Sequence, residues 1–363
     1  MDLRLAAKAH TELCATRLVQ QSSLWGGVKK RTGWTPKSFD LWLDGESAGD
    51  VLILERDLAD GMGLAYVPFG PEALPDEERR GEYLRALSAE LRPFLREGCA
   101  MIRWDLPWES PYAADDDRYD DDGHWLGPPA PRLRELRMNW GADGEALRKS
   151  AGDILPPDTM LVDLRAGEDA VLGRMKPKTR YNIRLAARRG VRVRRGGQED
   201  LALWMSLYAQ TARRKGIHPH GAEHFSAIFD ELGHAEHEKA TIRMLLAERD
   251  GEPLAAMFMS VSADAASYLY GASSDAGREY MGPYALQWEA MRLARREGCS
   301  AYDLFGVPPR PDPGHPMHGL YAFKAGFGGR MLHRQGAWDY AYDPRAYELI
   351  AAREATERGY HQP

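Results

Sequence analysis

The same order of predicted elements occurs twice in this chain, and this repeat constrains the fold more than any other feature of the sequence. The tetrapeptide Arg-Glu-Gly-Cys ends a helical pattern at Arg96–Cys99 and again at Arg296–Cys299. In both copies we expect the glycine to end the helix in the left-handed conformation. A short apolar run closed by proline follows each copy, at Met101–Leu106 and at Tyr302–Val307. Such self-similarity indicates two copies of one supersecondary unit.

Upstream of each tetrapeptide, the remaining elements also match in order. Strand-forming runs flank Asp44-Gly45 in the first half and Asp250-Gly251 in the second, which predicts a β-hairpin in each. A third strand and a helix follow. The predicted strands and helix are Ser38–Leu43, Asp50–Glu55, Gly63–Phe69 and Asp76–Glu97 in the first half, and Thr241–Glu248, Pro253–Ser262, Ala266–Ala272 and Tyr284–Glu297 in the second. This order favours a mixed α/β fold of two tandem units.

A proline-rich stretch marks the boundary between the halves. Gly127–Pro131 ends a polar loop, and Pro156-Pro157 precedes a strand predicted at Met160–Leu164. We expect a first unit over residues 1–160, completed by residues 336–363, and a second unit over residues 161–335. The 363 residues, 44% of them hydrophobic, suffice for two cores. The other predicted elements are helices at Lys178–Arg189, Asp200–Lys215, Ala222–Leu232 and Pro344–Arg358, and a strand at Leu332–Tyr342.

Cysteine usage and hydropathy indicate a soluble, cytoplasmic protein. The three cysteines include no C-x-x-C pair, which excludes a zinc ribbon and a dithiol redox motif and suits a reducing compartment. The first ten residues lack the apolar region of a secretory signal. The most apolar stretch, Leu254–Ala263, is about half as long as the ~20 residues that a membrane span needs.

Charge is informative only locally, because the net charge of −6 argues against a generally basic nucleic-acid binder. From Arg174 to Arg195 the chain carries ten lysines and arginines and no acid. Such a basic stripe attracts polyanions such as RNA or a pyrophosphate. A solvated helix face paired with acids elsewhere is the alternative, and charge alone leaves both open. The acidic segment Asp115–Asp122 lacks the glycine and glutamate of an EF-hand and predicts a solvated loop.

The order of elements in each half resembles that of a Gcn5-related N-acyltransferase (GNAT) unit. That fold separates two adjacent strands and holds an acyl group between them. In members that use coenzyme A, a glycine-rich turn after the third strand binds the pyrophosphate through backbone N–H groups. The corresponding turn here is Arg278–Ala285, in which Gly282 comes one residue late and Pro283 lacks an N–H. Coenzyme A is therefore disfavoured.

Six segments spread from about residue 20 to residue 340 carry a second, more specific resemblance. They are Gln21–Lys29, Met175–Ala186, Tyr268–Ser273, Leu286–Ala290, Tyr302–Gly306 and Gly319–Gly328, the last containing Phe-Lys-x-x-Phe-Gly. Together they resemble the FemABX-type, FemX-like aminoacyltransferases of bacteria. The resemblance implies tandem GNAT-like units. It also implies the absence of the coiled-coil arm that some members carry, because the chain between Tyr181 and Leu232 is too short for one.

The resemblance implies an activity in peptidoglycan cross-bridge synthesis. An amino acid would move from aminoacyl-tRNA to a side-chain amine of a muropeptide, either UDP-MurNAc-pentapeptide or lipid II. A lipid-linked acceptor would be met at the inner face of the membrane. The ester of the tRNA is already activated, so the reaction requires neither a metal nor another cofactor.

Two residues are candidates for catalysis by their place in the family's pattern. Lys324, in the Phe-Lys-x-x-Phe-Gly motif, would stabilise the tetrahedral oxyanion with its positive charge. Asp105, expected at the C-terminal end of the strand Met101–Leu106, would accept the proton of the amine or bind its ammonium form. The alternatives are an ordinary surface lysine near a helix end and a strand-end aspartate in a turn.

The remaining candidates are expected to bind substrate. Lys29 matches the family's phosphate-binding lysine, and Lys30 could replace it. His220 and His224 stand where the family has a phosphate-binding arginine and a tyrosine, which puts the acceptor's anionic group in doubt or transfers its binding to Arg213 or its neighbours. The other candidates are Arg180 and Arg184 in the basic stripe, Tyr270 on the third strand of the second unit, and Phe323 beside Lys324.

Three alternatives stay open at this point. The histidines at positions 218, 220 and 224 could form a metal site, although no carboxylate partner is placed by the sequence. The chain could be a coenzyme-A-dependent N-acyltransferase that acts on a small amine. It could also be a non-catalytic module that binds RNA or a precursor and keeps the fold without the reaction.

Overall fold

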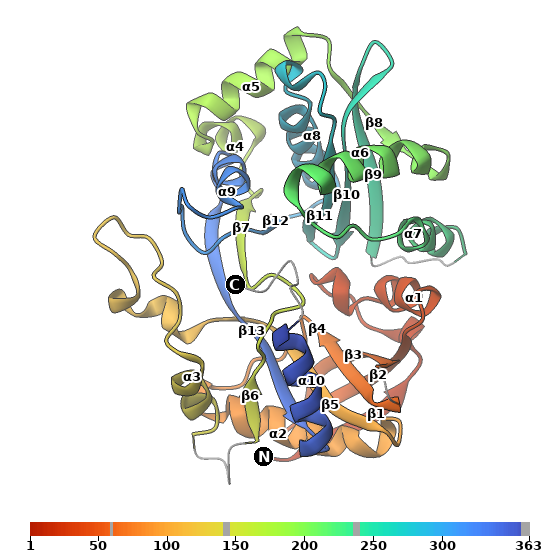
Figure 1. The fold of residues 1–363 in the computed structure, drawn as a ribbon, viewed down its shortest axis with the longest axis vertical. Coiled ribbons are helices and arrows are strands. Elements are labelled where there is room, and N and C mark those ends of the chain that lie inside the picture. Colours follow the sequence, from red (N-terminus) through yellow and green to blue (C-terminus); the bar gives the residue numbers. More distant parts are fainter. Residues whose placement is uncertain (59–60, 141–145, 235–239, 357–363) are drawn as a thin grey trace. The chain divides into compact units, whose positions relative to one another are not determined.

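The computed structural model describes residues 1–58, 61–140, 146–234 and 240–356. The chain divides into two compact units (Figure 1). Unit 1 comprises Met1–Cys14, Gln20–Pro157 and His333–Pro363, and unit 2 comprises Ala15–Val19 and Asp158–Leu332. The chain therefore passes from one unit to the other four times.

Unit 1 is built on a mixed sheet with the strand order β1-β2-β3-β4-β5-β13, in which only β4 and β5 are parallel. The short strand β6 pairs with β13. The strands are β1 (Leu3–Lys8), β2 (Thr35–Leu43), β3 (Glu46–Asp57), β4 (Gly63–Pro68), β5 (Cys99–Glu109), β6 (Leu147–Lys149) and β13 (Arg330–Ala341), and the helices are α1 (Ser23–Arg31), α2 (Arg80–Leu91), α3 (Pro131–Met138) and α10 (Pro344–Thr356). Strand β13 begins in unit 2 and continues in unit 1.

Unit 2 repeats this plan with the strand order β7-β12-β11-β10-β9-β8, in which only β11 and β12 are parallel. The strands are β7 (Asp158–Asp163), β8 (Arg192–Gly196), β9 (Ala240–Arg249), β10 (Glu252–Ser262), β11 (Ala265–Ser273) and β12 (Ala301–Gly306). The helices are α4 (Glu168–Arg174), α5 (Pro177–Arg188), α6 (Leu201–Lys215), α7 (Ala222–His234), α8 (Gly282–Arg296) and α9 (His318–Ala325). The predicted mixed α/β fold of two tandem GNAT-like units is confirmed.

Short 3-10 helices complete the described chain. They are η1 (His10–Glu12), η2 (Val19–Gln21), η4 (Glu77–Arg79), η5 (Arg92–Phe94), η6 (Pro111–Ala114), η7 (Asp116–Arg118), η8 (Gln198–Asp200) and η9 (Arg278–Tyr280). The acidic segment Asp115–Asp122 lies largely in exposed turns around η7, as expected of a solvated loop.

The two hairpin turns form as predicted. Asp44 and Gly45 have φ values of 53° and 87°, and Asp250 and Gly251 have φ values of 51° and 83°. Two successive residues with positive φ make a type I′ turn, whose twist matches that of the flanking strands. The Asp-Gly dipeptide therefore fixes the register of both hairpins.

The two Arg-Glu-Gly-Cys segments differ, and the expectation of a left-handed glycine is wrong for the first. Gly298 has a φ of 84° directly after α8, whereas Gly98 is not among the residues with positive φ. The reason is Pro93: α2 already ends at Leu91, and η5 carries the chain onward, so Gly98 no longer follows a helix.

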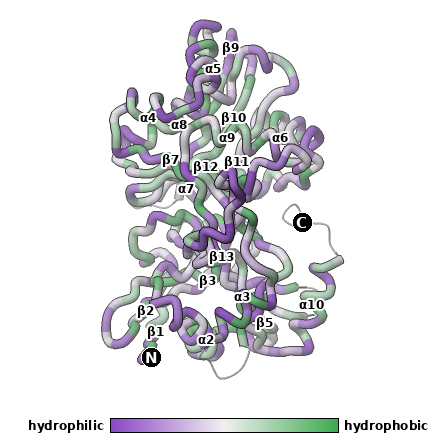
Figure 2. Tube along the Cα trace, turned by 90° about the vertical axis from the view of Figure 1, so that its left-hand side faces the viewer, coloured by the Kyte–Doolittle hydropathy of each residue, from purple (hydrophilic) through white to green (hydrophobic). Residues whose placement is uncertain are grey.

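Each unit has its own hydrophobic core. In unit 1 the buried face of α2, formed by Tyr83, Leu84, Leu87 and Leu91, packs on strand residues such as Trp104. In unit 2 the apolar face of α8 packs on β9, β10 and β11. Hydrophobic and hydrophilic segments alternate along the trace in both units (Figure 2). Among the described residues, no helix is both long and apolar enough to cross a bilayer.

Candidate active site

The parallel strand pair behaves differently in the two units. In unit 1, β4 pairs with β5 along its whole length. In unit 2, β11 and β12 pair only at three positions, the last being Ser267 opposite Asp303, although β11 continues to Ser273. The two strands therefore separate beyond Ser267. A GNAT-like unit is expected to hold its acyl group at such a separation.

Strand β12 leaves its regular path at Phe305. This residue has a φ of 60°, in the left-handed region that bulky residues rarely adopt, and the register with β7 shifts between Asp303 and Gly306. The carboxylate of Asp303 holds the turn, because its Oδ1 accepts hydrogen bonds from the Phe305 N–H at 2.7 Å and from the Thr159 hydroxyl. Such strained positions cost about 1–3 kcal/mol each and cluster at functional sites.

Lys324, in the last turn of α9, directs its ammonium group at this strained turn. Nζ donates hydrogen bonds to the carbonyl oxygens of Gly306 at 2.7 Å and Phe305 at 3.2 Å. Nζ also lies 5.2 Å from the ring centroid of Tyr268, and only 4% of the lysine is exposed. The alternative of an ordinary surface lysine is therefore wrong.

The environment of Lys324 is unfavourable for a permanent charge. Burial lowers the pKa of its ammonium group to about 7, and the nearby carboxylate of Asp303 offsets only part of this effect. A group that develops negative charge next to Nζ would favour the protonated form. The residue can thus supply positive charge where an oxyanion forms.

Phe323 contributes to the packing that holds Lys324. Its ring is half-buried and meets the ring of Tyr284, on α8, at 5.1 Å and the ring of Phe327 at 5.2 Å between centroids. The contact with Tyr284 joins α9 to α8. A direct contact of Phe323 with substrate stays a prediction.

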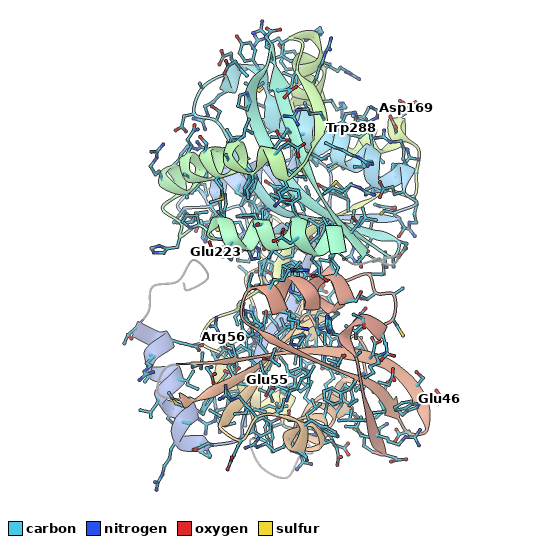
Figure 3. The ribbon with its side chains drawn as sticks, turned by 90° about the vertical axis from the view of Figure 1, so that its right-hand side faces the viewer. Glu46, Glu55, Arg56, Asp169, Glu223 and Trp288 are labelled. Atoms are coloured by element: carbon cyan, nitrogen blue, oxygen red, sulfur yellow. The ribbon has the colours of Figure 1, made fainter. Side chains whose placement is uncertain are left out.

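The structure brings His220, His224 and Tyr270 together in unit 2. His224 is buried, and its Nε2 lies 2.9 Å from the Tyr270 hydroxyl. The His220 ring stacks on that of His224 with centroids 4.5 Å apart. Glu223, labelled in Figure 3, precedes His224 in the first turn of α7. The described residues contain no group of three or more His, Cys, Asp or Glu side chains arranged to hold a metal ion.

This cluster continues into an aromatic core. Phe225 contacts His224, Tyr270 and Phe258, and Trp204 stacks on Tyr208. Burial raises the pKa of Tyr270, so its hydroxyl stays protonated at neutral pH. Among the members of this cluster, His220 is the exposed one, and it provides the cluster's polar surface.

The basic stripe contains both exposed arginines and arginines that are engaged within unit 2. Arg180 donates to the carbonyl oxygens of Gly173 and Met175 at the end of α4, so a substrate role for it competes with a structural one. Arg184, on the same helix α5, is exposed, as is Arg213 in the last turn of α6. The stripe does not form one helix face, because its last residues belong to β8 and Arg194 pairs there with Asp200 and Glu248.

In unit 1, Lys29 lies in a setting that Lys30 does not share. Lys29 is half-buried with Nζ 4.9 Å from the Trp25 ring centroid, whereas Lys30 is exposed. Burial and the neighbouring Arg56 lower the pKa of Lys29 to about 8. The two neighbouring cations, Lys29 and Arg56, favour an anionic ligand, although Glu354 offsets part of the charge of Arg56.

Asp105 lies within β5 and not at its end, which corrects the prediction from sequence. The strand runs on through Pro107 to Glu109, and the register with β13 shifts near this proline, an arrangement that tolerates its missing N–H. Asp105 is fully buried, and its Oδ2 accepts hydrogen bonds from the Tyr66 hydroxyl at 2.9 Å and the Leu155 N–H at 2.8 Å.

The surroundings of Asp105 favour its protonated form. Burial raises the pKa of its carboxyl group to about 7, and the nearby Asp153 adds to the increase. Its Oδ1 is buried without a hydrogen-bond partner among the described residues. Tyr66 also extends this group, since its ring lies 6.1 Å from that of Trp34, on which the Arg56 guanidinium stacks at 4.5 Å.

Sequence reasoning missed several of these residues. Arg56 follows the buried Glu55 on β3, and both are labelled in Figure 3. Nothing in the alternating pattern of that strand distinguishes a binding arginine from a solvated one. Asp303 was visible in the Tyr-Asp-Leu-Phe-Gly segment, but its role depends on Thr159, which is distant in sequence.

Comparisons with known proteins cover most of the chain. The sequence profile of the FemAB family matches residues 7–236 and 230–354. The lipid II:glycine glycyltransferase of Staphylococcus epidermidis is 25% identical over 390 residues, covering 91% of this chain and 89% of that protein. The protein of the same name from Staphylococcus aureus is 24% identical over 394 residues, with the same coverage.

Solved structures show the fold. The crystal structure of FemX superposes with a TM-score of 0.72 at 21% identity, covering 94% of this chain and 96% of that chain. A tandem GNAT protein from the clavulanic acid biosynthesis pathway superposes with a TM-score of 0.50 at 14% identity, covering 94% of this chain and 98% of that chain. Both likenesses extend over the two units.

Proposed function

Because this chain belongs to the FemAB family, we propose that it moves an amino acid from aminoacyl-tRNA to a side-chain amine of a peptidoglycan precursor. The observation that carries the proposal is the buried ammonium of Lys324 at the point where β11 and β12 separate. The relatives named lipid II:glycine glycyltransferase support lipid II as acceptor and glycine as the first donor to test. UDP-MurNAc-pentapeptide is the second acceptor to test.

In the proposed reaction, the amine nitrogen attacks the ester carbonyl carbon of the aminoacyl-tRNA. A C–N bond forms, and the carbonyl oxygen takes up negative charge in a tetrahedral intermediate. The Lys324 ammonium stabilises this oxyanion. Removal of one such donor typically costs about 2.7–4 kcal/mol of barrier lowering. The C–O bond to the ribose then breaks, and the ribose oxygen takes up, in net terms, the proton that the attacking amine gives up.

Asp105, in unit 1, is our candidate for accepting the proton of the amine or binding its ammonium form. A carboxyl group with a pKa of about 7 can take up and release a proton near neutral pH. Its buried Oδ1 accepts no hydrogen bond from any residue in the described part of unit 1, so it could accept one from an incoming ammonium. Since the side chain is fully buried, this step requires the substrate to open a path to it.

The cationic groups of each unit suit the anionic parts of the two substrates. In unit 1, Lys29, backed by Arg56, suits the phosphates of the precursor, with Lys30 as an exposed neighbour. In unit 2, the exposed Arg184 and Arg213 suit the tRNA backbone. The pair formed by His224 and Tyr270, with His220 stacked on it, offers hydrogen-bonding groups for the acceptor.

The test is transfer from a pool of tRNA charged with radiolabelled amino acids to UDP-linked and lipid-linked muropeptides. We expect label on a muropeptide. We expect no label when the charged tRNA is treated with ribonuclease before the reaction. Lys324→Met should abolish most of the transfer. Arg296→Met, which also removes one positive charge in unit 2 but at a half-exposed ion pair with Glu289, should retain it.

Two outcomes would contradict the proposal. Acyl transfer from acetyl-coenzyme A to an amine, without dependence on tRNA, would indicate a coenzyme-A-dependent N-acyltransferase. Binding of tRNA or precursor without transfer to either acceptor would indicate a non-catalytic module that kept the fold.

A further inference from the structure

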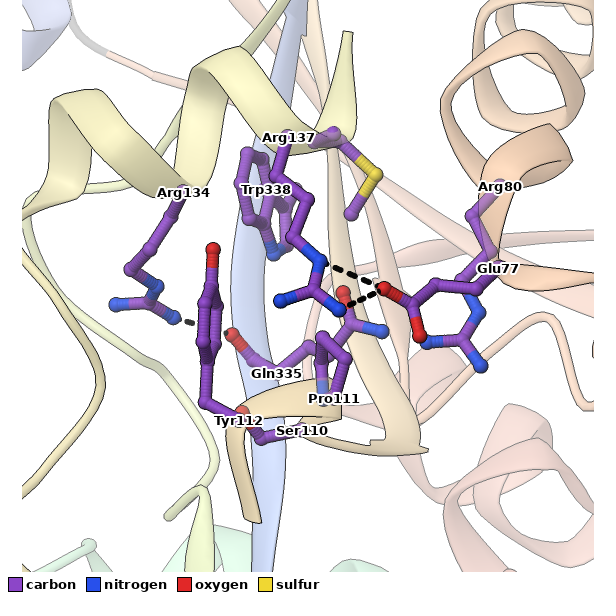
Figure 4. Close-up of a pocket in the computed structure, with 10 residues that line it drawn as sticks. Glu77, Arg80, Ser110, Pro111, Tyr112, Arg134, Arg137, Gln335 and Trp338 are labelled. Carbon is purple, nitrogen blue, oxygen red and sulfur yellow. Dashed lines mark hydrogen bonds and ion pairs between the residues drawn. The ribbon is translucent and has the colours of Figure 1, made fainter. Parts of the chain in front are cut away.

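A group of polar side chains that the proposed reaction does not use lines a pocket within unit 1. Figure 4 shows it between α3, the segment that leads into α2, and the bulged part of β13. Its charged and polar lining includes Glu77, Arg80, Arg134, Arg137, Gln335 and Trp338. None of these residues belongs to the groups around Lys29 or Asp105.

The pocket has more hydrogen-bond donors than acceptors. Nε and one terminal nitrogen of Arg80, Nε2 of Gln335 and Nε1 of Trp338 are buried and have no hydrogen-bond partner among the described residues. Gln335 and Trp338 are only 5% and 2% exposed. A buried donor without an acceptor is costly, so a site with several of them favours a ligand rich in acceptors.

The charges of the pocket also favour an anionic ligand. Among the described residues that line the pocket, the one carboxylate is Glu77, and Arg137 Nε donates to its Oε1 at 2.6 Å. Arg134 donates to the backbone carbonyl of Gln335 at 2.9 Å. Three described guanidinium groups therefore share one described carboxylate, which is hydrogen-bonded to Arg137 and also lies near Arg80. The balance is positive, as an anion site requires.

A β-bulge builds this arrangement. Residues three apart on a regular strand point to opposite faces, yet Gln335 and Trp338 both line the pocket. The register between β13 and β5 shifts at this point, and Gly336 has a φ of 68°. A side chain at Gly336 would collide with the carboxylate of Asp153, which accepts the Ala337 N–H. The glycine is thus required to aim both donors at one spot.

We propose that this pocket binds an oxyanionic group, a carboxylate or a phosphoryl group, through Arg80, Gln335 and Trp338. The ring of Tyr112, on which the Arg137 guanidinium stacks at 4.7 Å, supplies apolar surface for the part of the ligand that carries the anion. Binding at this pocket is independent of the proposed transfer reaction and can be measured without turnover.

The experiment follows the indole N–H resonance of Trp338 in the intact protein by NMR, with Trp338→Phe to assign it. Sodium phosphate is one probe and N-acetylalanine the other, both titrated at constant ionic strength. We expect a saturable shift with at least one of them. Arg80→Gln should weaken that binding by about tenfold or more, because a charge-assisted hydrogen bond is lost.

The controls keep the result unambiguous. Arg79→Gln makes the same change at the neighbouring arginine, which pairs with Asp44 and does not line the pocket, and it should leave the titration unchanged. Saturation by phosphate alone or by N-acetylalanine alone identifies the source of the anion. A shift that does not saturate, equal binding by Arg80→Gln, or an equal effect of the uncharged N-acetylalanine amide would each overturn the proposal.

Discussion

At the scale of single residues, the ionisation of Lys324 should set the alkaline limit of the reaction. Burial lowers the pKa of this ammonium to about 7, so the positive charge that stabilises the oxyanion is lost as the pH rises above that value. We expect kcat/KM for transfer to fall above about pH 7, since this constant reports ionisations of the free enzyme. Lys324→Met should lower the rate about 100- to 1000-fold.

The control for that prediction is the shape of the profile in the variant. If Lys324 is the group concerned, the residual activity of Lys324→Met lacks the fall above pH 7. A variant profile with the same alkaline limb, or a wild-type profile still rising at pH 9, would contradict the assignment. Thermal unfolding of the same variant separates loss of the charge from loss of the fold.

The same pKa predicts the sign of a stability change. Between about pH 7 and the ordinary lysine value of 10.5, the unfolded chain binds a proton at Lys324 that the folded chain does not bind. The contribution of Lys324 to the free energy of unfolding therefore increases as the pH rises through that window. Lys324→Met should be more stable than wild type, most clearly below pH 7. Urea unfolding at pH 6 and pH 9 measures the difference, and equal differences at both values would contradict it.

For Asp105 we expect the opposite dependence of the free energy of unfolding on pH. Its pKa is raised to about 7 in the folded state, from 3.8 for an ordinary aspartate, so the folded chain binds the extra proton between these values. The free energy of unfolding should therefore fall by on the order of a few kcal/mol as the pH rises from about 4 to 7. Asp105→Asn should flatten this dependence, as measured by urea unfolding across that range.

The control variant for Asp105→Asn is Asp169→Asn. It makes the same change at an exposed carboxylate on α4, which is labelled in Figure 3. That variant should keep the wild-type dependence on pH. If Asp105→Asn also kept it, the raised pKa of Asp105 would not contribute to stability.

Residues in short motifs could be predicted from sequence, whereas residues defined by distant partners could not. Lys324 was found because its motif is local. The side chains around Asp105 come from β4 and from the segment before β7, so its burial and its bonds to Tyr66 and Leu155 depend on the folded sheet. Gly98 shows the limit of a repeated tetrapeptide, because Pro93 alters the preceding helix in one copy only.

At the scale of elements, helix α5 provides a sharper test of tRNA binding than the whole basic stripe does. Arg184 and Arg188 are exposed on it, whereas Arg180 and Arg189 are engaged with backbone carbonyl oxygens. Replacing Arg184 and Arg188 by glutamate should weaken tRNA binding. It should also reduce the slope of log K against log salt concentration, as expected for the loss of about two phosphate contacts. Filter binding at several salt concentrations measures both quantities.

The matched control for α5 is the double replacement of Arg345 and Arg353 by glutamate on α10, where both arginines are exposed. It changes the net charge of the protein equally. If both double variants lost affinity to the same extent, general charge and not α5 would explain the binding.

The turn after α9 should be the least tolerant part of the Lys324 segment. Gly328 has a φ of 76°, and a Cβ atom there would lie 2.5 Å from the carbonyl oxygen of Arg174. We expect Gly328→Ala to lower the free energy of unfolding by at least about 1–3 kcal/mol. Gly319→Ala, in the same segment but within α9 and with open space around it, should be neutral or stabilising. Denaturant unfolding compares the two, and equal losses would show that the turn is not constrained.

Helices, strands and turns could be predicted from sequence where local residues determine them, and could not where distant residues do. The hairpins formed as expected because an Asp-Gly turn contains its own geometry. Strand β8 was hidden in the basic stripe, since Arg192–Gly196 has no apolar alternation and pairs with β9 through its backbone. The irregular path of β12 at Phe305 was also hidden, because Thr159 helps to hold it from another strand.

At the scale of the whole molecule, the two separate cores predict separate responses to core mutations. Leu84 is fully buried in the core of unit 1 and Met291 in that of unit 2. Replacing either residue by alanine should lower the free energy of unfolding by about 2–5 kcal/mol. Hydrogen exchange resolved by peptide should show lost protection in the unit that carries the change. Equal loss in both units after either change would mean that they unfold together.

The passage of the chain between the units also sets the order in which a ribosome can complete them. Unit 1 begins first but needs β13, whose later part follows Leu332, to pair with β5. Unit 2 has all of its residues once Leu332 has been synthesised. The usual rule is that the N-terminal domain folds first. Here we expect the edge of β5 to stay uncovered until residues beyond Leu332 emerge, so that the sheet of unit 1 is completed after unit 2 has all of its residues.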